Sequence, residues 1–112
     1  MNSTTPEETI HHNIDDLVEG ATIHHLAVEN RDIDVLMMAK ENDLLTVDRD
    51  KETPLHYATV NDDLEICKLL LTKAPQLKNM QCVEGKTVLD WAIEYNAEYN
   101  SHVDIIEFLQ EQ

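Results

Sequence analysis

Three short segments of this chain resemble one another and recur at a nearly constant spacing. They are GATIHHLA at residues 20–27, KETPLHYA at 51–58 and GKTVLDWA at 85–92. Their threonines, Thr22, Thr53 and Thr87, are 31 and 34 residues apart, and a second apolar run follows each segment. A period in the low thirties is typical of proteins built from stacked repeats, in which each unit buries its apolar face against the next.

Each repeated segment carries the local signals of a short helix. Threonine is a favoured N-cap, and Pro54 directly after Thr53 takes the first helical position, where its missing N–H costs nothing. The polar residues 61–63 then predict a turn, because Asn and Asp tolerate left-handed backbone conformations. The second apolar runs predict one further helix per unit, at 33–38, 64–71 and 103–109. The run 64–71 has the broad apolar stripe of a helix buried between neighbours.

These residues resemble the ankyrin repeat, whose signature is G-x-T-P-L-H-x-A followed by a turn and a V-V-x-L-L-L helix. Residues 53–58 match it almost letter for letter, and 85–92 match it with Val88 in place of Pro and Asp90 in place of His. The copy at 20–27 is the most degenerate. The resemblance covers residues 17–112 and implies an all-α fold, an ankyrin-repeat helical solenoid of stacked helix–turn–helix units. With a capping helix before these units, we expect seven helices in all.

The repeats divide the chain into a cap and three units. Residues 1–20 are predicted to form an N-terminal capping helix, because Thr5 and Glu8 have the spacing of a capping box and apolar residues follow at helical spacing. A degenerate ankyrin repeat is predicted at 21–47, a second repeat at 48–81 and a C-terminal repeat at 82–112. Five extra residues at 97–101 are predicted as an insertion in the last repeat.

The charge is strongly negative and unevenly distributed. The chain has 23 Asp and Glu against 8 Lys and Arg, a net charge of −15, and −12 of it lies in residues 1–30 and 87–112. Such a surface repels nucleic acids and anionic membranes, so neither is expected as a partner. No apolar run approaches the roughly 18 residues that a membrane span needs. The charge favours a partner protein with a basic surface, or serves only the solubility and capping of the stack.

The sequence gives no grounds for proposing catalysis, a cofactor or a metal site. Its two serines, Ser3 and Ser101, lie in a terminal and an inserted segment, so no positioned nucleophile is predicted. With two glycines the chain has no phosphate-binding loop. The adjacent histidines at 11–12 and 24–25 would diverge on a helix and could not hold one ion together.

The resemblance implies a structural role for three histidines. His25 and His56 occupy the motif's own histidine, which serves hydrogen bonding within and between repeats, and His102 falls on the histidine of the family's turn. Cys67 and Cys82 show no metal-binding spacing and are expected to be reduced thiols. This predicts a cytoplasmic protein, with the nucleus or a host-cell cytosol left open.

The resemblance also implies a binding surface made of loop tips and the exposed ends of the inner helices. The loop tips correspond to Arg49, Asp50, Glu52, Val83, Glu84 and Lys86. The helix ends correspond to Glu29, Asn30, Val60, Asn61, Glu94 and Tyr95. The alternative for each residue is an ordinary solvated position.

The last repeat concentrates the aromatic residues of the chain. Trp91, Tyr95 and Tyr99 are spaced i, i+4 and i+8, so they form one ridge if the inner helix continues. Trp91 stands where the motif has an aliphatic residue and is predicted to be core. Tyr95 and Tyr99, flanked by Glu94 and Glu98, have the composition of an interface anchor for a partner bearing Lys or Arg. Alternatively, Tyr99 folds back to cap the last repeat.

We therefore expect a non-catalytic protein–protein interaction module, a small acidic adaptor or inhibitor that binds a partner with a basic surface. Two alternatives stay open. One is a regulatory or structural subunit of a stable complex. The other is an immunity or anti-host factor that neutralises a basic target by charge mimicry. The sequence also permits a homo-oligomer, without indicating one.

Overall fold

The computed structural model describes residues 19–112. The predicted capping helix at 1–20 therefore lies almost wholly outside the described residues. Within 19–112 the chain forms seven α-helices and one 3-10 helix, and no strand occurs in this range. The all-α fold predicted from the repeats is confirmed for this part of the chain.

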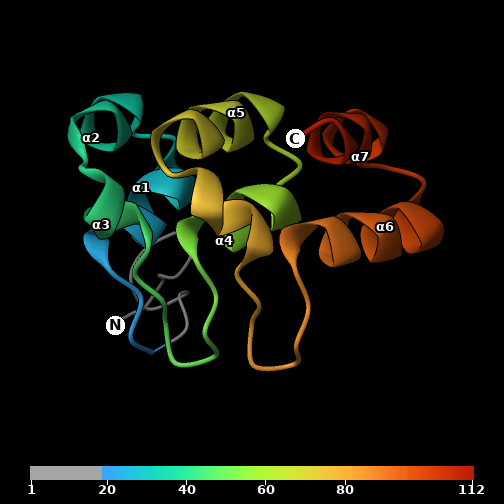
Figure 1. Ribbon diagram of the computed structural model, residues 1–112, viewed down its shortest axis with the longest axis horizontal. Helices are drawn as coiled ribbons and strands as arrows, with labels where there is room; N and C mark the ends of the chain where they lie inside the picture. Colours follow the sequence, from blue (N-terminus) through green and yellow to red (C-terminus); the bar gives the residue numbers. More distant parts are fainter. Residues whose placement is uncertain (1–18) are drawn as a thin grey trace, which may run out of the picture.

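The helices form two rows that run side by side (Figure 1). The inner row consists of α1 (Ile23–Asn30), α4 (Pro54–Val60) and α6 (Val88–Tyr99). The outer row consists of α2 (Ile33–Met38), α5 (Leu64–Lys73) and α7 (Val103–Gln110). Each inner helix packs against the outer helix that follows it, and α4 also packs against both α1 and α6. The long loops between units project together from the side of the inner row away from the outer row (Figure 1). This is a solenoid of helix–turn–helix units.

Two short helices were not predicted from the sequence. They are α3 (Glu41–Leu44) and η2 (Pro75–Asn79), which follow the outer helices of the first two units. Each buries one leucine completely, Leu44 or Leu77, and these leucines are 33 residues apart. A helix of four or five residues is too short to show an apolar period, so sequence patterning misses it. The predicted total of seven helices therefore agrees by coincidence, since it counted the capping helix and omitted α3.

The predicted N-caps are confirmed. The side chains of Thr22, Thr53 and Thr87 accept backbone N–H bonds at the starts of α1, α4 and α6, at 3.2–3.3 Å. The turn after α4 contains Asp62 with a φ of 56°, the left-handed conformation expected in the segment 61–63. Local sequence chemistry therefore accounts for where the inner helices begin and where the chain turns.

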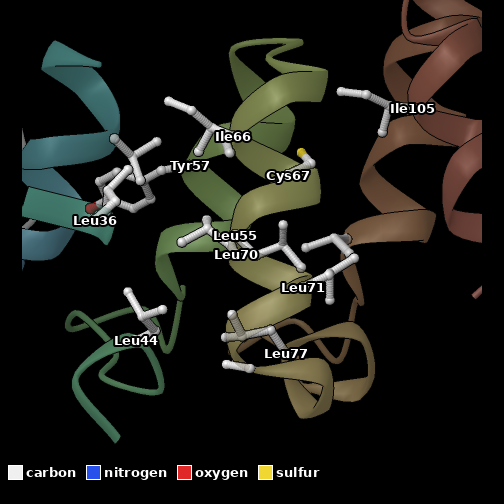
Figure 2. Close-up of a cluster of buried hydrophobic side chains, with 14 of the residues drawn as sticks. Leu36, Leu44, Leu55, Tyr57, Ile66, Cys67, Leu70, Leu71, Leu77 and Ile105 are labelled. Carbon is white, nitrogen blue, oxygen red and sulfur yellow. The ribbon is translucent and has the colours of Figure 1, made fainter. Parts of the chain in front are cut away.

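Helix α5 supplies the centre of the hydrophobic core (Figure 2). It lies between α2 and α7 and buries Ile66, Cys67, Leu70 and Leu71, as the stripe in 64–71 predicts. Burial raises the pKa of the Cys67 thiol to about 12, so it behaves as an apolar side chain. Neither cysteine forms a disulfide.

Candidate protein-binding surface

The predicted loop-tip residues lie on successive loops that adjoin one another. We call the continuous surface formed by these loops the ledge. The backbone N–H of Arg49 donates to the carbonyl of Glu19, and the N–H of Val83 donates to the carbonyl of Asp50, each at 2.8 Å. These two bonds join the three loops at their tips. Arg49, Val83 and Glu84 are exposed on this ledge. The structure therefore brings the tips together, although they are more than 30 residues apart in sequence.

A buried aspartate, Asp48, holds the second loop in shape. One of its oxygens accepts the backbone N–H groups of Asp50 and Glu52, both at 2.9 Å, and the other accepts the hydroxyl of Tyr57 at 2.7 Å. Burial, assisted by this bond, raises the pKa of the Tyr57 phenol. Sequence reasoning missed Asp48, because it stands outside the signature and no local pattern indicates a buried carboxylate. Its three bonds fix the backbone that presents Asp50 and Glu52.

Negative charge is concentrated where the second and third loops meet. Burial raises the pKa of Glu52 to about 7, and the neighbouring carboxylates of Asp48, Asp50 and Glu84 add to the effect. Carboxylates repel one another in a partly desolvated site, and an arriving cation relieves that repulsion. A positive group next to Glu52 would therefore relieve this repulsion.

Two histidines connect the inner helices to the following loops, as the family resemblance implies. The Nδ1 atoms of His25 and His56 accept the backbone N–H of Thr22 and Thr53 at 3.0 and 3.2 Å. Nε2 therefore carries the proton and donates to a carbonyl of the next unit, that of Glu52 at 2.8 Å or that of Lys86 at 3.2 Å. Burial lowers the pKa of both imidazoles, so they are neutral at pH 7. Each histidine thus positions the loop of the neighbouring repeat.

His102 makes a bond between units in the opposite direction. It is buried in the last turn with a φ of 68°, and its Nε2 lies 2.6 Å from the carbonyl oxygen of Thr59 in α4. Its ring also stacks on Tyr95, with centroids 5.1 Å apart. The turn histidine therefore fixes the end of α6 against the preceding repeat.

Helix α6 continues far enough to form the aromatic ridge. It has 12 residues against 7 in α4, so the extra residues at 97–101 mainly lengthen the helix. Tyr95 stacks on Tyr99, with centroids 5.9 Å apart and ring planes 29° apart. Tyr99 is 63% exposed, so its ring does not cap the core of the last repeat. The stacked pair, with Tyr95 partly buried and Tyr99 exposed, has the form of an interface anchor.

The prediction that Trp91 is core is wrong. Its indole packs edge-on against the buried His56 ring, with centroids 5.0 Å apart, but the side chain is only half-buried. Tyr57 makes the equivalent contact with His25 at 4.7 Å and is buried. Tyr57 lies in α4, which has an inner helix on each side, α1 and α6. Trp91 lies in α6, for which one inner neighbour, α4, is described. Part of the indole therefore stays uncovered.

The aromatic ridge forms one wall of a hollow with a volume of about 290 Å³. The hollow is lined by Glu84, Lys86, Trp91, Glu94, Tyr95, Glu98 and Tyr99. Five of these were predicted as partner-binding from the sequence: Glu84, Lys86, Glu94, Tyr95 and Tyr99. The other predicted residues do not line it: Glu29, Asn30, Arg49, Asp50, Glu52, Val60, Asn61 and Val83. These eight lie on the ledge or at helix ends outside the hollow.

Lys86 is the one cation in the lining of the hollow. Its Nζ lies 2.9 Å from an Oε of Glu94 and 3.8 Å from an Oε of Glu84. The hydrogen bond with Glu94 raises the pKa of Lys86. Within residues 19–112, no Lys or Arg forms an ion pair with Glu98, the third carboxylate of the lining. The hollow thus keeps an excess of negative charge.

The exposed end of α4 lies apart from the hollow. Val60 is 36% exposed, and the amide of Asn61 donates to a carboxylate oxygen of Glu29 at 3.1 Å. This bond joins the ends of neighbouring inner helices. These residues form a partly exposed edge at the ends of α1 and α4.

The family model for ankyrin repeats (3 copies) matches the chain over residues 6–80 and again over 24–112. This chain belongs to the ankyrin-repeat family. Ankyrin repeats are in general protein–protein interaction modules and are typically non-catalytic. Comparison with curated proteins gives no match. In the described range, no helix is long and apolar enough to cross a membrane.

Proposed function

We propose that this ankyrin-repeat chain is a non-catalytic adaptor or inhibitor that binds a partner protein with a basic surface. The hollow of the last repeat and the adjoining loop ledge form the binding face. The observation that carries this proposal is the lining of the hollow, which combines three aromatic rings with three carboxylates and one lysine. A reducing compartment such as the cytoplasm suits the two free thiols.

Physical chemistry supports this choice of partner. Aromatic side chains supply much of the binding energy at protein interfaces, because they bury a large area at a small cost in conformational entropy. The net charge of −15 steers a basic partner toward the protein over long distances. The carboxylates around the rings then select Lys and Arg over neutral or acidic side chains. The long-range attraction by the negative charge and the anchoring by the aromatic rings therefore act on the same face of the protein.

The proposal is tested by capture of partners with an immobilised chain and a matched pair of variants. Tyr95→Ala with Tyr99→Ala removes the anchor, whereas Met37→Ala with Met38→Ala removes two exposed apolar side chains of α2. We expect the tyrosine variant to lose at least about tenfold in captured basic protein, as for loss of an aromatic hot spot. The methionine variant retains capture. Equal capture by both variants, with unchanged melting temperatures, would refute the proposed face.

Salt separates a charge-steered inhibitor from a subunit held by an apolar interface. The association rate with a captured partner should fall steeply as sodium chloride rises from about 50 to about 500 mM, because exposed charges become screened. A rate that does not change with salt would indicate the stable-complex alternative instead.

A further inference from the structure

We infer that the hollow of the last repeat is a binding site for one arginine side chain of the basic partner, and that Lys86 holds the place of that cation in the free protein. This rests on the proposed function and adds the chemical identity of the anchoring group. The site is built from α6 on one side and the loop before it on the other.

The aromatic wall suits a planar cation. The ring of Tyr99 is 63% exposed and stacks on that of Tyr95, with centroids 5.9 Å apart and planes inclined by 29°, so Tyr99 offers an accessible aromatic ring that Tyr95 supports. A cation gains electrostatic attraction when it lies within about 6 Å of an aromatic centroid. The guanidinium of arginine also stacks on such a surface, which the compact and strongly hydrated ammonium of lysine does not.

The carboxylates suit a group with several donors in a plane. Glu94 and Glu98 are one helical turn apart on α6, on the same face of the helix. Glu84 comes from the loop, and Lys86 Nζ reaches both Glu84 and Glu94, so those two carboxylates approach a common point. Arginine has five N–H donors and binds carboxylates in a bidentate manner. One guanidinium can therefore bond to carboxylates while its face rests on a tyrosine.

Lys86 shows that the hollow already holds a positive group. Its side chain remains 37% exposed, and its hydrogen bond with Glu94 raises its pKa. An incoming guanidinium competes with this ammonium for Glu94 and Glu84. A Lys86→Met substitution, which removes this charge, should therefore strengthen the binding of arginine, although it adds no new contact.

The experiment uses Trp91, the single tryptophan of the chain, as a fluorescence reporter inside the hollow. The full 112-residue protein is titrated with N-acetyl-arginine amide, Nα-acetyl-lysine amide and N-acetyl-citrulline amide. Citrulline has nearly the shape of arginine without its charge. We expect the arginine probe to bind at least about fivefold more tightly than the lysine probe, with no saturable binding of citrulline.

Three variants are measured with the same probes. Lys86→Met should tighten arginine binding about threefold or more, because it frees two carboxylates. Glu94→Gln with Glu98→Gln should weaken it about tenfold. The control is Glu107→Gln with Glu111→Gln, which removes the same amount of charge at α7, outside the hollow. It should change the affinity for the arginine probe by no more than about twofold. Thermal melts establish that each variant is folded.

Nona-lysine and nona-arginine peptides distinguish this inference from the proposed function. If both peptides bind equally and both lose binding with the tyrosine variant, the basic-partner face stands and the arginine site is refuted. If neither peptide nor any basic protein depends on Tyr95 and Tyr99, the proposed function fails as well. Unchanged arginine affinity in Lys86→Met refutes the role of Lys86 as a placeholder.

Discussion

The second and last repeats use the same backbone plan with different side chains at equivalent positions. Asp48 and Tyr57 form a buried hydrogen bond in the second repeat, and the residues 34 positions later are Cys82 and Trp91. His56 reaches the next loop, whereas its counterpart Asp90 only bonds back to the backbone N–H of Thr87 at 2.9 Å. In the second repeat the polar side chains thus brace its own loop and bond to the next one, whereas the equivalent residues of the last repeat do neither.

The difference shows how the last repeat acquires the hollow that we propose as a binding surface. A unit with a described neighbour on each side buries its ring and its histidine, as Tyr57 and His56 show. The last unit has a described neighbour on one side, so its tryptophan stays half-exposed and its inner helix can lengthen. The carboxylates of α6 and the loop then surround rings that a further repeat would cover. The features that depart from the repeat signature are those that line the hollow.

The largest effect should come from a core leucine of the second repeat. Leu70→Ala removes a fully buried side chain from α5 and should lower the free energy of unfolding by ~2–5 kcal/mol through the resulting cavity. Leu109→Ala in α7 is the matched change in the last repeat, where the terminal helix can relax more easily. Urea denaturation followed by circular dichroism measures both. A loss below about 1 kcal/mol for Leu70→Ala would contradict the packing of α5.

A smaller effect should distinguish the two equivalent capping residues. His56→Ala leaves the buried backbone N–H of Thr53 without its partner and removes one of the two hydrogen bonds to the Lys86 carbonyl, so it should cost about 1–3 kcal/mol. Asp90→Ala removes one exposed hydrogen bond and should cost about 1 kcal/mol or less. Urea denaturation gives both values, and Trp91 fluorescence should shift only in His56→Ala, because the two rings are in contact. Equal costs would show that the bridge to the next repeat adds nothing.

The smallest effect concerns pH. Because burial lowers the pKa of His25 and His56 below 6.5, the unfolded chain binds more protons, and their stabilising contribution declines as pH falls below about 6.5. Glu52 acts oppositely, since its raised pKa of about 7 favours the folded state as pH falls from 7 toward 4.5.

The variant Glu52→Gln separates these two contributions. In this variant the free energy of unfolding should fall more steeply between pH 7 and about pH 5 than in the wild type, because the histidine contribution is no longer opposed. NMR titration of the two imidazoles, compared with the chain in concentrated urea, checks the direction directly. Midpoints at or above those of the unfolded chain would show that the histidines are not neutral hydrogen-bond bridges.

The sequence predicted most of the fold because its signals are local and repeated. The N-cap threonines, Pro54 and the apolar run 64–71 each act within one helix, so three similar copies give consistent predictions. The helices α3 and η2 were missed because a helix of one turn has no period to detect. Asp48 was missed because burial of a carboxylate depends on Tyr57 and on two backbone N–H groups in a folded loop.

The candidate site was predictable only in part. The spacing of Trp91, Tyr95 and Tyr99 indicated a ridge, and the loop tips were named from the resemblance. Which of these residues meet could not be read from the sequence, because the hollow joins a loop to the far part of a helix. The exposure of Trp91 was predicted wrongly for the same reason, since burial depends on what packs beside α6.

The sequence by itself determined the ankyrin architecture, the starts of the inner helices and the negative charge. Each of these follows from the type and local spacing of residues, and does not depend on which other parts of the chain pack beside them. Only the tertiary structure decided that Lys86 meets Glu94, that the exposed Tyr99 stacks on Tyr95, and that three carboxylates and three rings line one hollow. These contacts depend on the stacking of one unit on the next and on the uncovered side of the last, which no local pattern encodes.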